Sequence, residues 1–165
     1  MSNFESTIGP LLAREGGEFV TDDNGLGACK WGVTLSSYRA AHPEATEETI
    51  RAMTPEAAGE FYREEFWERY HIGLLSDQAV ADKVMDLAVN CGGGNAVRML
   101  QTVIGVKVDY VLGPRTAAVA NSLQPSDLIG GLRIAAAERY RSLAATDPAK
   151  YGGDLAGWLA RNETV

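Results

Sequence analysis

The sequence predicts an all-α (mainly α) protein built from two small helical lobes. Apolar residues recur at three- and four-residue intervals along most of the chain, which is the spacing of one face of an α-helix. Glycine, proline and capping residues stand where these segments begin and end. One stretch, residues 18–32, is rich in glycine and aspartate without a helical period, and it predicts a turn-rich loop or a short hairpin.

The first lobe is expected to span residues 1–90. Its first helix has one apolar face and ends at or just after Glu15, because two glycines follow. After the loop, short helices are expected over about 34–41 and 47–53. Thr54-Pro55-Glu56 supplies an N-cap, a first-turn proline and a first-turn acid for the next helix. That helix carries the aromatic residues Phe61, Tyr62, Phe66 and Trp67.

A further helix over 76–90 stops at the glycine run 92–94, where we place the boundary between the lobes. The second lobe, residues 91–165, begins with a helix over about 95–104. Pro114 then opens a helix to about 123, and Asp127 is expected to cap a long helix to about 145. A last helix is expected over 154–161.

Composition and charge exclude several functional classes. The net charge is −7 and no expected helix face carries a Lys/Arg cluster, so nucleic acid is not an expected partner. The N-terminus lacks a signal-peptide pattern, and no run of about 18 apolar residues predicts insertion into a membrane. The two cysteines, Cys29 and Cys91, are expected to be reduced thiols, although a single bridge between them is not excluded.

Metal and cofactor sites are not predicted. The spacing of His42, His71, Cys29 and Cys91 matches no metal-binding motif. The chain lacks a G-x-S-x-G turn, and its glycine run follows a helix rather than the strand that precedes a phosphate loop. We therefore expect neither a metal nor a cofactor.

Glu15 is the first candidate for chemistry. Its expected place in the last turn of a helix puts its carboxyl group at the negative end of the helix dipole, which favours the protonated form that a general acid needs. Gly16 and Gly17 would let a bulky substrate approach the backbone. The alternative is a surface glutamate before a glycine C-cap.

If the general acid acts on a glycosidic bond, a second carboxylate is normally needed. Asp22 and Asp23 in the following loop are the available partners for Glu15. Either residue is equally compatible with an Asx turn that shapes the loop. The sequence does not distinguish between them.

Four further residues are candidates for binding a sugar substrate. Trp31, Tyr62 and Trp67 offer aromatic faces for stacking, with core packing as the alternative, which the helical spacing favours for Trp67. Asn90 is suited either to hydrogen-bond an N-acetyl group or to cap its helix. For Asp86, a buried ion pair with an arginine is the stronger interpretation.

An ordered set of motifs resembles one enzyme family over nearly the whole chain. Glu15-Gly16-Gly17 followed by residues 30–34 resembles the EGG-containing signature of glycoside hydrolase family 108. Residues 61–67 resemble the family's tyrosine-and-tryptophan helix, and residues 86–92 resemble its D-x-A-V-N-x-G element. Residues 101–116, including Gln101, resemble the peptidoglycan-binding module that usually follows.

The resemblance implies a lysozyme-like catalytic lobe and an N-acetylmuramidase that cleaves the β-1,4 bond between N-acetylmuramic acid and N-acetylglucosamine in peptidoglycan. The family's catalytic glutamate corresponds to Glu15. Its loop usually resembles N-D-P-x-D-P-G-G, and Thr21 and Asn24 stand where the family has aspartates. Cys29 stands where the family often has threonine.

The same resemblance implies a phage or prophage lytic protein, of the endolysin type. We expect a monomer made in the bacterial cytoplasm that reaches the cell wall through a holin or a secretion system, because no signal peptide is visible. Two rival functions stay open: a non-catalytic peptidoglycan-binding protein on the same fold, and an adaptor in secretion or phage assembly.

Overall fold

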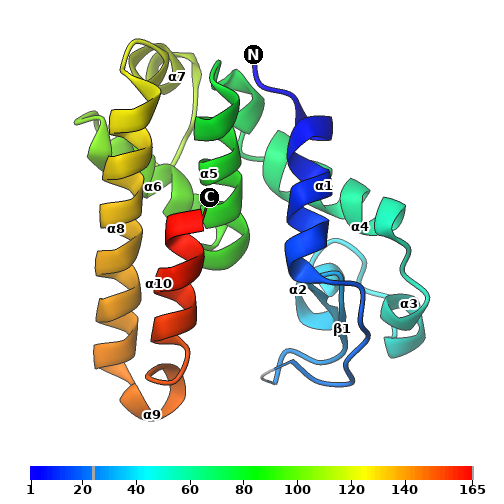
Figure 1. Ribbon diagram of the computed structural model, residues 1–165. Helices are drawn as coiled ribbons and strands as arrows, with labels where there is room; N and C mark the ends of the chain where they lie inside the picture. Colours follow the sequence, from blue (N-terminus) through cyan, green and yellow to red (C-terminus); the bar gives the residue numbers. More distant parts are fainter. Residues whose placement is uncertain (24, 165) are drawn as a thin grey trace. The chain divides into compact units, whose positions relative to one another are not determined.

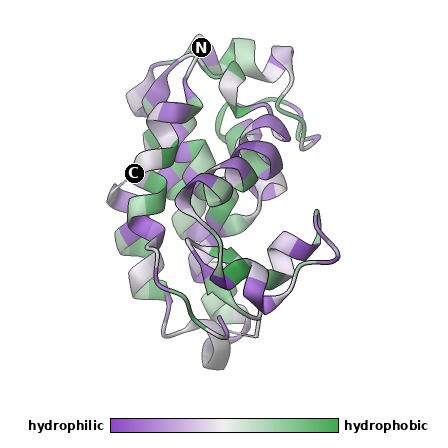
Figure 2. Ribbon diagram, turned by 90° about the vertical axis from the view of Figure 1, so that its right-hand side faces the viewer, coloured by the Kyte–Doolittle hydropathy of each residue, from purple (hydrophilic) through white to green (hydrophobic). Residues whose placement is uncertain are grey.

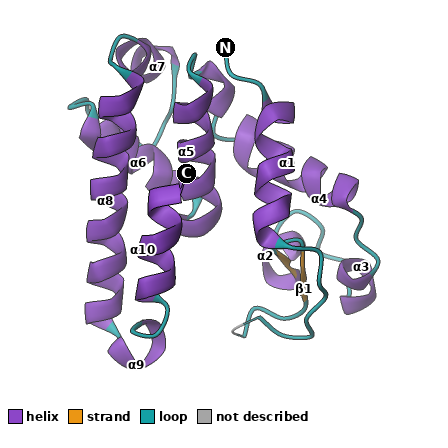
Figure 3. Ribbon diagram, in the orientation of Figure 1, coloured by secondary structure: helices purple, strands orange, loops and turns teal. Residues whose placement is uncertain are grey.

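The computed structural model describes residues 1–23 and 25–164 (Figure 1). The chain forms two compact units. We call residues 4–69 the N-terminal unit, and residues 1–3 together with the chain from Tyr70 onward the C-terminal unit. Helices dominate both units, which confirms the mainly α prediction (Figure 3). The boundary predicted at residue 90 stays a prediction.

The N-terminal unit begins with α1 (Phe4–Glu15), which ends at Glu15 as expected. A two-stranded antiparallel sheet follows, made of β1 (Cys29–Lys30) and β2 (Val33–Thr34), so the short hairpin was the correct alternative for the end of the loop. In Figure 3 the sheet lies beside the C-terminal end of α1. The remaining elements are α2 (Leu35–Arg39), α3 (Glu47–Arg51), α4 (Pro55–Tyr62) and η1 (Arg63–Glu68).

Threonine caps fix where the three helices after the sheet begin. The hydroxyl groups of Thr34, Thr46 and Thr54 each accept a hydrogen bond from the backbone N–H three residues later. Pro55 then occupies the first turn of α4, where no intrahelical donor is needed. The N-cap predicted at Thr54 is therefore confirmed.

The aromatic helix changes its winding in the middle. We expected one α-helix from residue 54 through Trp67, but α4 ends at Tyr62 and continues as the π-helix η1. The wider turn places Phe66 against two rings of the preceding turn, with centroids 6.1 Å from Phe61 and 5.8 Å from Tyr62. Packing of these rings offsets the poorer backbone geometry of the π-turn.

The regular secondary structure of the C-terminal unit, over its described residues, consists of helices. It contains η2 (Ile72–Leu74), α5 (Gln78–Cys91), α6 (Gly93–Val103), α7 (Pro114–Asn121), α8 (Pro125–Thr146), α9 (Pro148–Tyr151) and α10 (Leu155–Thr164). Helix α5 contacts α6 and α8, and α10 contacts α8 (Figure 1). The N-cap predicted at Asp127 was wrong, because α8 begins with Pro125 and Asp127 lies in its first turn.

Helices in Figure 2 carry hydrophilic as well as hydrophobic segments. Over residues 1–23 and 25–164, no helix combines the length and the apolar character needed to cross a membrane.

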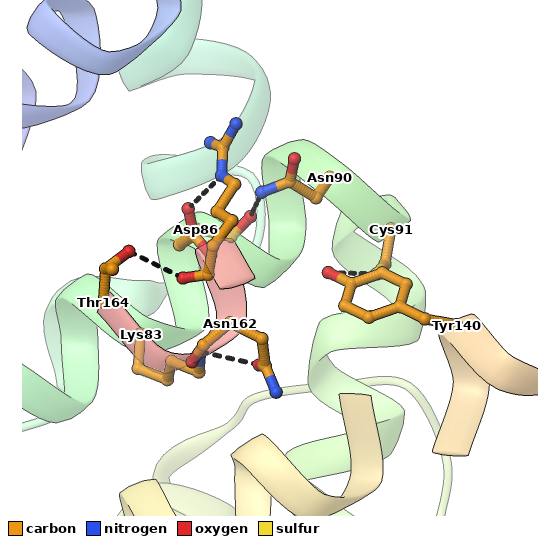
Figure 4. Close-up of polar contacts among 8 residues, drawn as sticks. Lys83, Asp86, Asn90, Cys91, Tyr140, Asn162 and Thr164 are labelled. Carbon is orange, nitrogen blue, oxygen red and sulfur yellow. Dashed lines mark hydrogen bonds and ion pairs between the residues drawn. The ribbon is translucent and has the colours of Figure 1, made fainter. Parts of the chain in front are cut away.

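A polar cluster is buried inside the C-terminal unit (Figure 4). Asp86 is 1% exposed and pairs with Arg161, whose Nε lies 3.0 Å from the Asp86 carboxylate. The interpretation of Asp86 as the carboxylate of a buried ion pair is therefore confirmed. Lys83 is fully buried and donates two hydrogen bonds of 2.8 Å to the backbone and side-chain oxygens of Asn162. These hydrogen bonds and the ion pair connect α10 to α5.

Burial also predicts a pH dependence of stability. Desolvation lowers the pKa of Lys83 to about 8, although the nearby Asp86 carboxylate acts in the opposite direction. In the unfolded chain lysine still binds its proton between pH 8 and its ordinary pKa, so the free energy of unfolding should rise from pH 8 to pH 9. The slope should be at most about 1.4 kcal/mol per pH unit. Urea denaturation at the two pH values checks this, and a Lys83→Met variant that shows the same rise would contradict it.

Candidate functional site

The candidate active site lies where α1 ends. Glu15 is the last residue of α1 and is half-buried. Gly16 has a φ of +73°, and its N–H donates to the Leu12 carbonyl at 3.0 Å. A left-handed glycine directly after the helix turns the chain away from the helix axis. The backbone therefore bends directly after Glu15 and does not continue as another helical turn.

The hairpin between β1 and β2 faces Glu15. Its two turn residues, Trp31 and Gly32, have φ values of +55° and +73°, as in a two-residue type I′ turn. A positive φ is strained for a bulky residue such as tryptophan. The Tyr62 hydroxyl donates a 3.0 Å hydrogen bond to the Trp31 carbonyl and so helps to hold this strained turn.

Gly32 lies directly against the Glu15 carboxylate. A Cβ atom built on Gly32 would lie 2.7 Å from Glu15 Oε2 and 2.6 Å from the Tyr62 hydroxyl oxygen. A side chain here would displace the Glu15 carboxylate and the Tyr62 hydroxyl, and the φ of +73° is itself strained for any residue other than glycine. The carboxylate thus lies over bare backbone between the end of α1 and the hairpin.

Gly17 makes a second close approach, to the Trp31 indole. A Cβ on Gly17 would lie 2.4 Å from the indole atom Cη2. The Trp31 side chain is half-buried, and its ring N–H has no hydrogen-bond partner among the described residues. The two glycines after Glu15 therefore have separate tasks: Gly16 supplies the bend, and Gly17 makes room for the indole.

The loop that carries the predicted carboxylates is closed at its base by the backbone pairing of Val20 with Cys29, at 2.9 Å in both directions. Within it, the two carboxylate oxygens of Asp22 accept the N–H groups of Gly25 and Gly27, each at 3.0 Å. Asp22 is exposed, and its hydrogen bonds to the backbone three and five residues later shape the loop. Thr21 is also exposed, and Asn24 lies outside the described residues.

Asp23 lies on the side of the loop that approaches Cys29. Burial raises the pKa of the Cys29 thiol to about 11, with further contributions from the carboxylates of Asp23 and Glu15. Asp23 also forms a hydrogen bond with the thiol, whereas the Gly32 N–H acts in the opposite direction. Asp23, unlike Asp22, therefore contacts Cys29, and the Glu15 carboxylate is near enough to the thiol to raise its pKa.

This environment predicts a poorly reactive thiol at Cys29. A rise in pKa to about 11 from the ordinary 9.0 reduces the thiolate fraction at pH 7.5 about 100-fold. Alkylation of Cys29 by iodoacetamide in the folded protein should therefore be at least about 100-fold slower than that of free cysteine. Peptide mapping by mass spectrometry measures it separately from Cys91, and complete labelling of Cys29 within minutes would contradict the proposed contacts.

Three of the predicted binding residues make contacts within the protein. Tyr62 is 1% exposed and Trp67 8% exposed, and Trp67 packs edge-on against Phe4 with ring centroids 5.6 Å apart. Neither ring offers a face to a ligand, so the geometry favours core packing for Trp67 and a positioning role for Tyr62. Asn90 is exposed in the C-terminal unit, and its amide donates a 2.7 Å hydrogen bond to the Asp86 carbonyl one turn earlier in α5.

Gly32 is the site residue to which sequence reasoning assigned no role. Gly32 approaches Glu15 across more than ten residues of intervening chain, and the periodicity of the sequence gives no information about such a distant approach. The sequence contained a weak indication of this turn, because glycine is typical of the second position of a two-residue hairpin turn. Among the described residues, no group of three or more His, Cys, Asp or Glu side chains is placed to hold a metal ion.

Comparison with known proteins matches both parts of the chain. A family model described as glycosyl hydrolase 108 matches residues 8–92, and one described as a predicted peptidoglycan domain matches residues 95–163. Among solved structures, the chain is similar to Brucella abortus SagA, with a TM-score of 0.76 and 26% identity over 98% of this chain and 94% of that one. Comparison with curated proteins gives no match.

Proposed function

Because the chain belongs to the glycosyl hydrolase 108 family and its second part matches a predicted peptidoglycan domain, we propose that it is an N-acetylmuramidase. The two matches make the chain a glycoside hydrolase of peptidoglycan. What we propose beyond these matches is the bond that is cleaved, the β-1,4 linkage from N-acetylmuramic acid to N-acetylglucosamine. We also propose that it acts at the bacterial cell wall as a monomeric lytic protein of the endolysin type.

The observation that carries this proposal is the position of Glu15, whose carboxylate lies over the bare backbone of Gly32 at the end of α1. A half-buried carboxyl group beside open backbone is suited to protonate a glycosidic oxygen. The proton goes to the leaving oxygen as the C1–O bond breaks, and positive charge develops on the sugar ring. A second carboxylate then stabilises that charge or activates the water that attacks C1.

Identification of the products tests which bond is cleaved. Purified peptidoglycan is digested with the wild-type protein, and the soluble fragments are reduced with borohydride and analysed by mass spectrometry. A muramidase leaves N-acetylmuramic acid at the new reducing end, so reduced muramic acid is the expected product. Reduced glucosamine or an anhydro sugar would overturn the proposed bond. No cleavage of several wall types by a folded protein would favour the non-catalytic binding protein.

We propose Asp23 as the second carboxylate, because it contacts Cys29, whose pKa the Glu15 carboxylate also raises, while Asp22 is engaged by two backbone N–H groups. Asp23→Asn should lower kcat about 10- to 100-fold without a change in melting temperature. Asp22→Asn is the matched control, since it keeps an acceptor oxygen for the loop and should retain most of the activity. Release of reducing ends measures both, and equal losses in the two variants would count against the assignment.

A further inference from the structure

The C-terminal unit has a pocket of about 330 Å³ between α6 and α8, lined by polar side chains and by Met99, Ala135 and Leu143. Arg98 and Thr102, one turn apart on α6, line one side, and Glu138, Arg139 and Ser142 on α8 line the other. On α8, Glu138 and Arg139 lie four and three positions before Ser142, so each lies on the same side of the helix as Ser142. That face adjoins the buried stripe that joins α8 to the core, formed by Leu128, Leu132, Ala136, Tyr140 and Ala144.

The two arginines in the pocket have no carboxylate partner among the residues that the structure describes. Within the described part of the chain, neither the Arg98 nor the Arg139 guanidinium forms an ion pair or a hydrogen bond with another side chain. The Nε of Arg139 is fully buried and has no hydrogen-bond partner there. A buried N–H donor without an acceptor is costly, and a guanidinium group is the side chain best shaped to bind a carboxylate.

The charges of the pocket narrow the class of ligand. Two guanidinium groups and the Glu138 carboxylate give a net charge of about +1 in a chain whose overall charge is −7. This arrangement of charges favours a ligand whose carboxylate binds the arginines and whose ammonium group binds Glu138. The hydroxyl groups of Thr102 and Ser142 are suited to bind peptide N–H and carbonyl groups.

We propose that this pocket binds the stem peptide of peptidoglycan, a short peptide that carries free carboxylates and an amino group. The inference rests on the proposed function for the substrate, and it assigns the peptide to a site separate from the one that contains Glu15. A phosphate polymer of the cell wall is less suited to the pocket, because Glu138 repels a second negative charge.

Calorimetric titration of the full-length protein with a free stem tripeptide, L-Ala-γ-D-Glu-L-Lys, tests the proposal. Wild type should bind the tripeptide, and the same peptide with its carboxylates amidated should bind at least tenfold more weakly. Arg98→Gln and Arg139→Gln should each weaken binding of the tripeptide about tenfold or more. Arg141→Gln is the matched control, because Arg141 is an exposed arginine of α8 outside the pocket, and it should change affinity less than twofold.

Three results would overturn the proposal: no binding of the tripeptide by wild type at millimolar concentration, an equal loss of affinity in Arg139→Gln and Arg141→Gln, or tighter binding of inorganic phosphate than of the tripeptide at the same residues. The titration requires no glycan cleavage. Failure of wild type to cleave peptide-free glycan strands would therefore count against the muramidase and not against the pocket.

Discussion

Glu15→Gln should lower the rate of peptidoglycan cleavage about 1,000-fold. Glutamine keeps the size of the side chain but has no proton to give to the leaving oxygen, and general acid catalysis contributes roughly 100- to 10,000-fold to such reactions. Reducing ends released per minute measure the rate. The fold should survive, because the half-buried side chain lies over backbone and forms no part of the apolar core.

Glu18→Gln is the matched control for this substitution. Glu18 is an exposed glutamate three residues after Glu15, and the change in charge is the same. Wild-type rates in this variant, together with unchanged melting temperatures in both, would assign the loss to the acid itself. A Glu15→Gln protein that keeps more than a tenth of the wild-type rate would remove Glu15 from the mechanism.

Asp86→Asn should destabilise the protein by about 3 kcal/mol, which is the effect of breaking a buried ion pair by removing one partner. The substitution leaves the guanidinium group of Arg161 without its carboxylate and removes a negative charge close to the buried Lys83. Urea denaturation monitored by circular dichroism measures the loss. Because the contacts between α5 and α10 depend on these charges, the end of the chain should become sensitive to proteases.

Asp82→Asn, one turn earlier on α5, is the comparison for Asp86. Asp82 accepts a hydrogen bond from Gln78 at 2.8 Å near the surface, so its loss should cost no more than about 1 kcal/mol. If both substitutions cost the same, the ion pair with Arg161 contributes no more than an ordinary surface hydrogen bond.

Features that depend on local sequence were predicted well. The end of α1 at Glu15 follows from the glycines after it, and the start of α4 follows from Thr54 and Pro55. The burial of Asp86 was also anticipated, because a carboxylate within an apolar helix face needs a cationic partner. The arginine that supplies it comes 75 residues later, and its identity was not predictable.

Features that depend on distant contacts were not predicted. The positive φ of Trp31 is held by a hydrogen bond from Tyr62, 31 residues away, and the position of Gly32 against Glu15 depends on how the hairpin folds back. Likewise, Asp22 and Asp23 are neighbours with the same chemistry, and only the turn decides that one binds the backbone while the other approaches Cys29. Secondary-structure propensity and hydrophobic periodicity carry no information about which distant residues come into contact.

The π-helix η1 has a consequence for comparing this chain with its relatives. Its backbone hydrogen bonds enclose one residue more than those of an α-helix, so α4 and η1 together hold one residue that a regular helix of the same turns would not. A relative without the wide turn should therefore align with a one-residue gap inside residues 63–68, in the middle of a helix rather than in a loop. An alignment that forbids gaps within helices would shift the register of Phe66 and Trp67, and it would match core aromatic residues with surface positions.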